Sequence, residues 1–320
     1  MISFIVIGRN EGWKLDLCLK SIHKTIKENQ YIKSEIIYID SNSSDNSIEI
    51  AKQNGPIKIF RLTKTYSPPI ARNLGANQSD GNILFFIDGD MEIESSFLKH
   101  VINQNEELCY DFINGFYIDY FYNKGWELLY TKQNPVPERI NHDYFEHITG
   151  GLFMINRGLW EKVGGMKNYM TRGADPDLAL RIAKLGYSKL RKNKLMARHH
   201  TIKGKHAANF SGLLNRDHLT GRILLYRENI FSFVTLRRLI RHEYMMLVLL
   251  TTVGISFVNN LMLVVSGCIY LAGITLRTYM RFRHLKALPA MICKDIIFIL
   301  GFIFYWPPRV ISEVEFESIC

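Results

Sequence analysis

A chain of 320 residues is long enough for one large α/β domain and an appendage of roughly a hundred residues. Its net charge of +10 is concentrated in the segment 181–241, just before an apolar stretch, which favours an anionic membrane surface as a partner over nucleic acid; a solvated basic face stays open. The five cysteines show neither CxxC pairs nor zinc-finger spacing, which excludes a disulfide-framed secreted module and a zinc finger.

The N-terminal part alternates short apolar runs with amphipathic stretches. Strands are expected at 3–7, 35–39, 57–62 and 82–87, and helices at 15–26, 47–53 and 69–77. Asp45 is the expected N-cap of the second helix. The alternation predicts an α/β fold with a Rossmann-like, mainly parallel sheet and helices on both faces. Ligands of such sheets bind beyond the carboxyl ends of the strands, where Glu11, Asp40, Asp88 and Asp90 lie.

The middle of the chain is aromatic and irregular. A strand is expected at 112–119, a binding loop at 120–148, a strand at 149–155 and helices at 157–163 and 175–184. Trp126 either stacks on a sugar or packs in the core. Gly150 and Gly151 either allow an acceptor to approach closely or only begin the next strand. We assign these three residues, together with Asp177, to an acceptor site.

The C-terminal part is apolar, with no charged residue from Tyr244 to Leu276. Asn259 and Asn260 divide this run into two arms, each too short for a full span. Basic residues flank both ends, which favours a helical hairpin that dips into a membrane from the cytoplasmic side, over a buried helix pair. The segment 296–306 is expected in the interface. The N-terminus lacks the basic and apolar regions of a signal peptide, so we expect the cytoplasmic face of a membrane.

These patterns predict four parts of the chain. They are an α/β domain over 1–210, a basic helical linker over 211–243, an apolar hairpin with an interfacial helix over 244–308, and a tail over 309–320.

The strongest chemical motif is Asp88-Gly89-Asp90 after an apolar strand. Two carboxylates separated by one small residue can bind a divalent metal, Mn²⁺ or Mg²⁺, and through it a diphosphate. An isolated Asp-x-Asp is more often a turn, but the end of a strand favours a site. Asp40 and Glu11 suit hydrogen bonds to a nucleoside, although Asp40 also suits a turn. Arg72 suits a phosphate or a base, or else a surface ion pair.

Five segments together resemble the motifs of the family-2 glycosyltransferases in order and spacing. They are 3–11, 39–45, 71–75, 86–90 and 173–178, and the resemblance covers roughly residues 1–200. It implies a GT-A fold, an inverting mechanism and a nucleotide-diphospho-sugar donor.

The resemblance also implies roles for single residues. Glu11 and Asp40 would hold the nucleoside, Arg72 would lie near the base or diphosphate, Asp88 would meet the sugar or ribose and support the metal, and Asp90 would bind the metal directly. Asp175 falls at the catalytic base, with Asp177 as the fallback. His199 or His200 lies where some members supply a further metal ligand. The family usually has Glu-Asp where this chain has Ala174-Asp175, which departs from the acceptor-site pattern.

We therefore expect a non-processive enzyme that moves one sugar to a glycan acceptor, preferably lipid-linked. The Gln-x-x-Arg-Trp motif of processive synthases is absent. A sugar-nucleotide pyrophosphorylase would need a glycine-rich basic loop where Arg9-Asn10-Glu11 stands. A polyprenyl-phosphate sugar transferase stays open, as does a membrane-bound pseudoenzyme, which Ala174 suggests.

Overall fold

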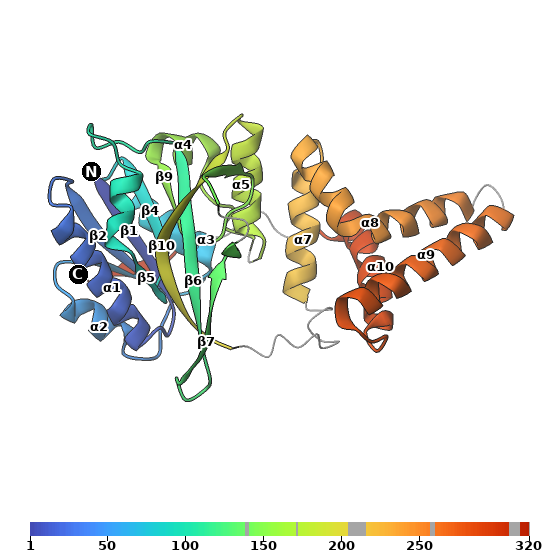
Figure 1. The fold of residues 1–320 in the computed structure, drawn as a ribbon, viewed down its shortest axis with the longest axis horizontal. Coiled ribbons are helices and arrows are strands. Elements are labelled where there is room, and N and C mark those ends of the chain that lie inside the picture. The colour runs from blue at the N-terminus through green and yellow to red at the C-terminus, as the bar shows by residue number, and fades with distance from the viewer. Residues whose placement is uncertain (138–140, 171, 204–215, 257–259, 307–313, 320) are drawn as a thin grey trace. The chain divides into compact units, whose positions relative to one another are not determined.

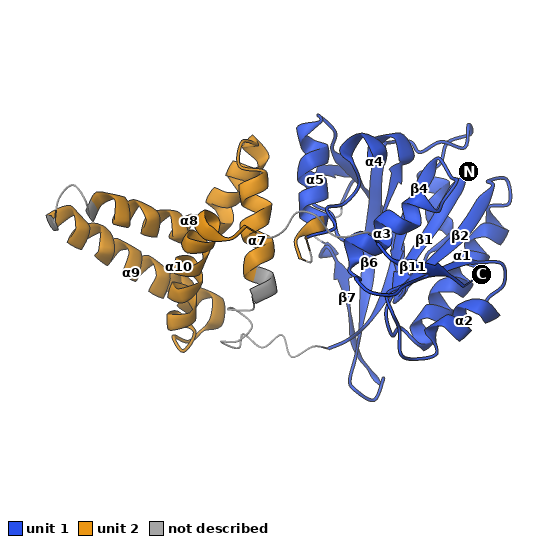
Figure 2. Ribbon diagram, turned by 180° about the vertical axis from the view of Figure 1, so that it is seen from behind, with its two compact units in different colours: residues 1–169, 175–203, 310–320 blue, residues 170–174, 204–309 orange. Residues whose placement is uncertain are grey.

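The computed structural model describes residues 1–137, 141–170, 172–203, 216–256, 260–306 and 314–319. The chain divides into two compact units (Figure 2). The α/β unit comprises residues 1–169, 175–203 and 310–320, and the helical unit comprises residues 170–174 and 204–309. The expected boundary at residue 210 lies outside the described residues, so the four-part division remains a prediction.

The α/β unit is built on one sheet, which has eleven strands within the described residues (Figure 1). The strands are β1 (Ile2–Gly8), β2 (Ser34–Asp40), β3 (Lys58–Leu62), β4 (Ile83–Asp88), β5 (Met91–Ile93), β6 (Phe112–Tyr122), β7 (Leu128–Asn134), β8 (Tyr144–Glu146), β9 (Phe153–Asn156), β10 (Lys189–Ile202) and β11 (Phe316–Ser318). Their order is β11-β3-β2-β1-β4-β9-β6-β10-β5, with β7 on β6 and β8 on β10.

The sheet has a parallel half and a mixed half. Strands β3, β2, β1 and β4 are parallel, as the sequence predicts. Beyond β4, β9 runs antiparallel to both β4 and β6, while β10 is parallel to β6 and antiparallel to β5. The α/β class is confirmed, but the sheet is parallel only over its N-terminal half. Strand β11, expected only as part of a tail, pairs antiparallel with the edge strand β3.

Helices cover both faces of the sheet because β1 is apolar on both sides. Phe4 and Val6 belong to the core beneath α1 (Trp13–Glu28) and α2 (Ser47–Gln53). Ile5 and Ile7 belong to the core beneath α3 (Pro68–Asn77), α4 (Arg157–Val163) and α5 (Ala174–Lys184). A Cβ on Gly75 of α3 would lie 2.3 Å from Ile5 Cγ2, so only glycine allows this helix to lie so close to β1.

The helix ends differ in detail from the predicted caps. The N-cap residue of α2 is Asn46, not Asp45, although Asp45 Oδ1 accepts hydrogen bonds from the backbone and hydroxyl of Ser47. Asn156 is at the N-cap of α4, but its side chain donates to Asp111 Oδ1.

The basic segment 181–241 does not act as one surface. Its part in β10 belongs to the α/β unit and is paired with acids of that unit. The pairs are Lys189 and Arg191 with Glu146, Lys192 with Asp143, and Arg198 with Glu94. The basic residues of β10 therefore balance carboxylates of the α/β unit, and the membrane-facing role of the segment remains a prediction.

The helical unit contains α7 (Arg216–Glu228), α8 (Phe233–Ser256), α9 (Asn260–Phe282) and α10 (Leu288–Phe304). Helix α8 is kinked at Glu243, which is fully buried. Lys294 Nζ lies 3.2 Å from Glu243 Oε2, and Arg222 contacts the same carboxylate. The sequence places Lys294 and Asp295 before an interfacial helix. Instead they lie buried in the middle of α10, because this carboxylate needs a partner.

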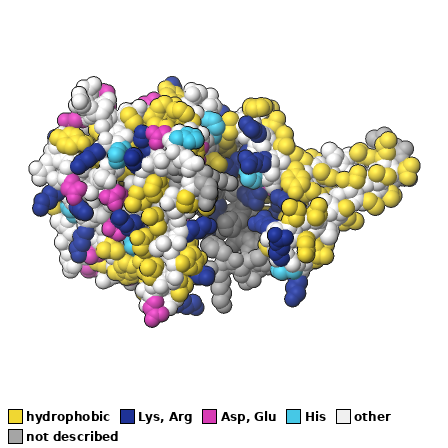
Figure 3. All heavy atoms as spheres, in the orientation of Figure 1, with side chains coloured by type: hydrophobic (Ala, Val, Ile, Leu, Met, Phe, Trp, Pro, Cys, Tyr) yellow, Lys and Arg dark blue, Asp and Glu magenta, His cyan; other side chains and the backbone are white. Residues whose placement is uncertain are grey.

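Helix α9 is apolar and exposed. Among the described residues, the segment Leu261–Phe282 is long and apolar enough to cross a membrane. Leu261, Val264, Ile269 and Met280 are each at least 60% exposed. Hydrophobic side chains cover much of the α8–α9 arm in Figure 3. The predicted break at Asn259 lies outside the described residues, and α9 begins at Asn260. The membrane hairpin remains a prediction.

Candidate functional site

The site lies at the carboxyl ends of the parallel strands. In the sheet register Asp88, the last residue of β4, lies beside Ile7, and Gly8 at the end of β1 lies beside Asp40 at the end of β2. The chain therefore brings Asp40, Asp88 and the following Asp90 to one edge, as predicted from the strand pattern.

Arg72 connects two of the predicted carboxylates. Its side chain, 3% exposed, donates from Nη2 to Asp88 Oδ1 at 2.7 Å and from Nη1 to Asp175 Oδ1 at 3.1 Å. Burial raises the pKa of Asp88, and the nearby Asp90 and Asp175 add to this effect against that of Arg72. The arginine thus contacts the base predicted on α5 and the first residue of the Asp-x-Asp motif. The two carboxylates alone explain the position of Arg72, without a contact to a nucleobase or a diphosphate.

Gly151 packs against this ion pair. A Cβ at residue 151 would lie 2.3 Å from Asp88 Oδ2 and 2.4 Å from Arg72 Nη2. Gly150, by contrast, has open space around it, and both glycines precede β9 instead of starting it. Residue 151 therefore limits the room above the Arg72–Asp88 pair.

Asp90 lies among charged residues from three other segments. His199 Nε2 of β10 lies 3.2 Å from Asp90 Oδ2, and Lys14 Nζ of α1 lies 3.9 Å from the same oxygen. Lys14 also donates to Glu11, whose pKa is raised by burial and by Asp90. Glu11 and Asp90 are therefore neighbours that share one lysine.

His199 is held between two carboxylates. Its Nδ1 lies 2.7 Å from Asp119 Oδ1 on β6, and its Nε2 faces Asp90. Burial opposes the charged ring, but the bonds to Asp119 and Asp90 outweigh it and raise the pKa of His199 to about 10. Asp119 could not be predicted from the sequence, because the pairing of β6 with β10 leaves no local signal in either segment.

His200 and Trp126 belong to an aromatic cluster beside Asp90. His200 Nδ1 bonds to the hydroxyl of Tyr122 at 2.9 Å, and the His200 ring contacts Trp13. Trp126 packs edge-on against Trp13 at 5.1 Å and lies 5.6 Å from Lys14 Nζ. Trp126 and Trp13 stay more than a third exposed. Only His199 of the two histidines faces Asp90, so the adjacent residues point to different surroundings.

Asp40 shapes the loop that follows it. It is fully buried, and its oxygens accept from the Tyr38 hydroxyl at 3.0 Å and from the Ser43 backbone at 2.8 Å. Asn10, in a left-handed conformation, binds this loop through the Ser44 backbone. Both Asp40 oxygens therefore already have partners within the protein, and Asp40 fixes the loop beside Glu11.

Asp177 is used in the core of the α/β unit. It is fully buried, with Lys167 Nζ at 3.0 Å from Oδ1 and Arg181 Nε at 2.7 Å from Oδ2. The side chain of Asp175, two residues earlier in the first turn of α5, is 31% exposed. Of these two carboxylates, Asp175 is accessible to solvent and Asp177 is not.

The described residues contain no ready-made cluster of three or more acidic, histidine or cysteine ligands. The donor set nevertheless fits a divalent cation, since Asp90 in the turn between β4 and β5 faces His199 on β10, with Asp88 two residues before Asp90. A carboxylate and an imidazole suit Mn²⁺. The metal itself belongs to the proposal below.

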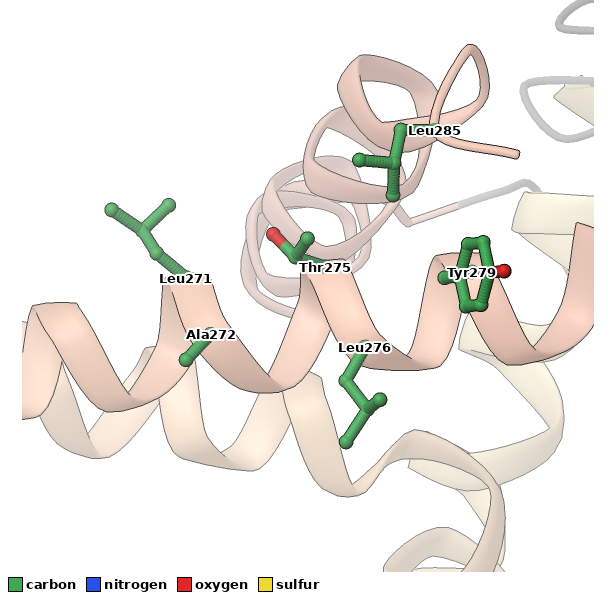
Figure 4. Close-up of a pocket in the computed structure, with 6 residues that line it drawn as sticks. All are labelled: Leu271, Ala272, Thr275, Leu276, Tyr279 and Leu285. Atoms are coloured by element: carbon green, nitrogen blue, oxygen red, sulfur yellow. The ribbon is translucent and has the colours of Figure 1, made fainter. Parts of the chain in front are cut away.

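A depression lies in the helical unit (Figure 4). Its volume is about 550 Å³, and its lining is apolar apart from Thr275 and the hydroxyl of Tyr279. No acid, histidine or lysine lines it, so it offers no group for acid–base chemistry.

Comparison with known proteins decides the family. The sequence profile described as "Glycosyl transferase family 2" matches residues 3–164, half of the chain. The chain belongs to glycosyl transferase family 2. The prediction of a glycosyltransferase is thereby confirmed.

Named relatives of this family member include glycosyltransferases from several kingdoms. Glycosyltransferase AglE of Haloferax volcanii is 26% identical over 240 residues, covering 69% of this chain and 72% of that protein. Cholesterol galactosyltransferase of Borreliella burgdorferi is 32% identical over 108 residues, covering 32% of this chain and 28% of that protein. Human polypeptide N-acetylgalactosaminyltransferase 13 is 25% identical over 192 residues, and the match spans only 34% of its length.

Solved structures show the same fold as this family-2 chain. The mannosyltransferase PcManGT of Pyrobaculum calidifontis, in complex with GDP-Man and Mn²⁺, has a TM-score of 0.55 at 14% identity, over 93% of this chain and 86% of that one. GalNAc-T7 with UDP, GalNAc and Mn²⁺ has a TM-score of 0.53 at 17% identity, over 71% of this chain and 47% of that one. These neighbours establish the GT-A fold.

Proposed function

We propose that this glycosyltransferase moves one sugar from a nucleotide-diphospho-sugar to a glycan acceptor with inversion, using a divalent metal. The observation that supports it most is that two clusters of side chains lie next to each other after β4. In the first cluster, Arg72 joins Asp88 to Asp175. In the second, Lys14 and His199 lie beside Asp90, and Lys14 also contacts Glu11. One cluster contains an exposed carboxylate suited to a base, and the other contains ligands suited to a metal.

The donor would bind along the carboxyl edge of β1, β2 and β4. Glu11 and the loop held by Asp40 and Asn10 would receive the nucleoside. Asp90 and His199 would hold Mn²⁺ or Mg²⁺, with Asp88 beside them. When bound, the metal neutralises charge on the departing diphosphate. The solved neighbours, one with GDP-Man and one with UDP and each with Mn²⁺, support a nucleotide-sugar donor and a divalent metal for this fold.

The transfer would be a single displacement. Asp175 takes the proton of the acceptor hydroxyl while that oxygen attacks the anomeric carbon and the nucleoside diphosphate leaves from the opposite face. Arg72 holds Asp175 in place through Nη1 while its other nitrogen is used by Asp88. The backbone of Gly151 packs directly against this pair, so a side chain at residue 151 would displace Asp88 or Arg72. Gly150 and the exposed Trp126 would belong to the acceptor side.

The acceptor would be lipid-linked and reached at the cytoplasmic face of an anionic membrane. Two features support this: the exposed apolar side of α9, and arginines near the α8 and α9 ends opposite their connection, namely Arg237, Arg238, Arg241, Arg277 and Arg281. The similarity to a protein named cholesterol galactosyltransferase agrees with a lipid acceptor. Flotation with vesicles that contain or lack anionic lipid tests the membrane part separately.

The function is tested by nucleoside diphosphate release from UDP-, GDP- and dTDP-sugars with membrane extract as acceptor. Each donor is assayed with Mn²⁺, with Mg²⁺ and with chelator, for the wild type, Asp90→Asn and the surface control Glu161→Gln, whose side chain is 63% exposed. We expect release from one donor that requires metal, survives in Glu161→Gln and is lost in Asp90→Asn.

Two results would redirect the proposal. Products extracted as a sugar on polyprenyl phosphate, with no glycan extended, would establish the polyprenyl-phosphate sugar transferase. If folded, membrane-bound protein released no nucleoside diphosphate from any donor, catalysis would be contradicted and the pseudoenzyme supported. Ala174→Glu would then be the first variant to test for restored activity.

A further inference from the structure

We infer that Asp119 is a positioning residue that orients His199 as a ligand of the metal. The inference rests on the proposed metal-dependent function. It adds a residue from β6, a strand that supplies none of the predicted metal ligands.

The geometry follows from the pairing of two strands. β6 and β10 are parallel, and Asp119 is the register partner of His199, so both side chains leave the same face of the sheet side by side. Asp119 Oδ1 lies 2.7 Å from His199 Nδ1, and Asp119 is only 8% exposed. A short hydrogen bond between two groups on neighbouring strands fixes the rotation of the imidazole ring.

The same contact determines which nitrogen is free for a metal. A histidine ligates through a nitrogen that carries a lone pair, and a carboxylate on the other nitrogen holds the ring proton there. With Asp119 at Nδ1, the nitrogen left for a cation is Nε2, which lies 3.2 Å from Asp90 Oδ2. Asp119 thus directs the histidine toward the aspartate that is proposed to bind the metal.

Neighbouring residues show that this arrangement is particular to His199. The adjacent His200 has the hydroxyl of Tyr122 at Nδ1 and an aromatic surrounding. The ring of Tyr117 packs edge-on against His199 at 6.1 Å, but its hydroxyl accepts from Asn134 Nδ2 at 2.6 Å. Tyr117 therefore supports the ring by packing, while Asp119 contacts the ring nitrogen.

The test is Mn²⁺ binding to the full chain, measured by electron paramagnetic resonance with and without UDP. The variants are Asp119→Ala, Asp119→Asn and the matched control Glu92→Gln, which removes a carboxylate next to His200. An amide oxygen still accepts the Nδ1 proton, so Asp119→Asn should bind Mn²⁺ within about threefold of wild type. Asp119→Ala should bind it about 10- to 100-fold more weakly. Glu92→Gln should match wild type.

A spectroscopic signature separates positioning from general stability. Bound Mn²⁺ in wild type and Asp119→Asn should show nitrogen modulation from a coordinated imidazole, and in Asp119→Ala that modulation should be lost. If Asp119→Ala kept the Mn²⁺ affinity and the nitrogen modulation of wild type while Asp90→Asn no longer bound Mn²⁺, the role of Asp119 would be refuted. The proposed metal site would still stand. If wild type bound no Mn²⁺, or Asp90→Asn bound it normally, the proposed metal site would fail and the inference with it.

Discussion

Arg72 Nη1 lies 3.1 Å from Asp175 Oδ1, so the arginine of α3 holds the proposed base at the start of α5. The other terminal nitrogen, Nη2, is 2.7 Å from Asp88 Oδ1. A guanidinium reaches two carboxylates at once because it is planar and carries several donors. One buried side chain therefore fixes the distance between the base and the Asp-x-Asp motif.

Arg72→Lys should lower kcat/KM at least tenfold while the protein stays folded. A lysine keeps the charge but lacks the planar fork, so it cannot hold both carboxylates in this geometry. Steady-state kinetics with the donor that the release assay identifies measures the effect. Arg157→Lys is the matched control, because Arg157 donates to Ser79 and to backbone carbonyls of Ala76, Ser79 and Gly81 and pairs with Glu161, away from the Asp-x-Asp motif. It should lower the melting temperature without changing kcat; equal kinetics for both variants would refute the role of Arg72.

Asp175→Asn and Asp177→Asn should fail in different ways. The first should lower kcat about 10²- to 10⁴-fold with little change in melting temperature, since it removes the proposed base and leaves a similar shape. The second should destabilise the fold by about 3–5 kcal/mol, because Lys167 and Arg181 lose a buried partner. Circular dichroism melting and kinetics on both variants decide between them. A folded, fully active Asp175→Asn would return the role of base to Asp177.

Gly151→Ala should reduce activity strongly, whereas Gly158→Ala should not. The new methyl group at 151 would lie 2.3 Å from Asp88 Oδ2, so Asp88 or Arg72 would have to move. At Gly158 of α4 a Cβ meets nothing within 4 Å. The ratio of kcat/KM between the two variants is the measurement, and a ratio near one would mean that the Arg72–Asp88 pair is free to shift.

Lys189 should make the stability of the α/β unit rise with pH between about 8 and 10.5. Burial lowers the pKa of Lys189 to about 8 from 10.5, against the pull of Glu146. In this window the unfolded chain binds the proton and the folded chain does not, so the free energy of unfolding increases with pH. The full shift corresponds to roughly 3 kcal/mol.

Lys189→Met tests this relation by removing the titrating group. Glu146 keeps Arg191 as a partner at 2.7 Å, so the variant should remain folded. Urea unfolding at pH 7.5 and pH 10.5 should show that the wild type gains stability relative to the variant as pH rises. An equal change in both proteins would show that Lys189 keeps an ordinary pKa in the fold.

The first half of the sheet could be predicted because its elements are locally complete. The run from Ile83 to Ile87 is apolar on both faces and ends in polar residues, and its neighbours β1 and β2 share this pattern. Parallel strands then bring their ends to one edge, so the meeting of Asp40, Asp88 and Asp90 needs no further information.

The second half depended on pairing between distant segments. Strand β10 is rich in Lys and Arg, which suggests a solvated surface, yet it lies in the sheet because Glu146 and Glu94 balance its charges. Its register with β6 is set by tertiary packing, and that register alone places Asp119 at His199. The burial of Lys294 could not be predicted either, because its partner Glu243 lies on another helix.

Strand β11 also has a consequence for the order in which the molecule forms. It follows helices α7–α10 in the chain, yet it covers the edge of β3, with Phe316 against Phe60. During synthesis the catalytic sheet therefore emerges long before its last strand, and β3 leaves the ribosome with unpaired backbone groups along one side. Nascent chains on neighbouring ribosomes are most exposed to edge-to-edge pairing in that interval, which lasts until residues 316–318 pair with β3.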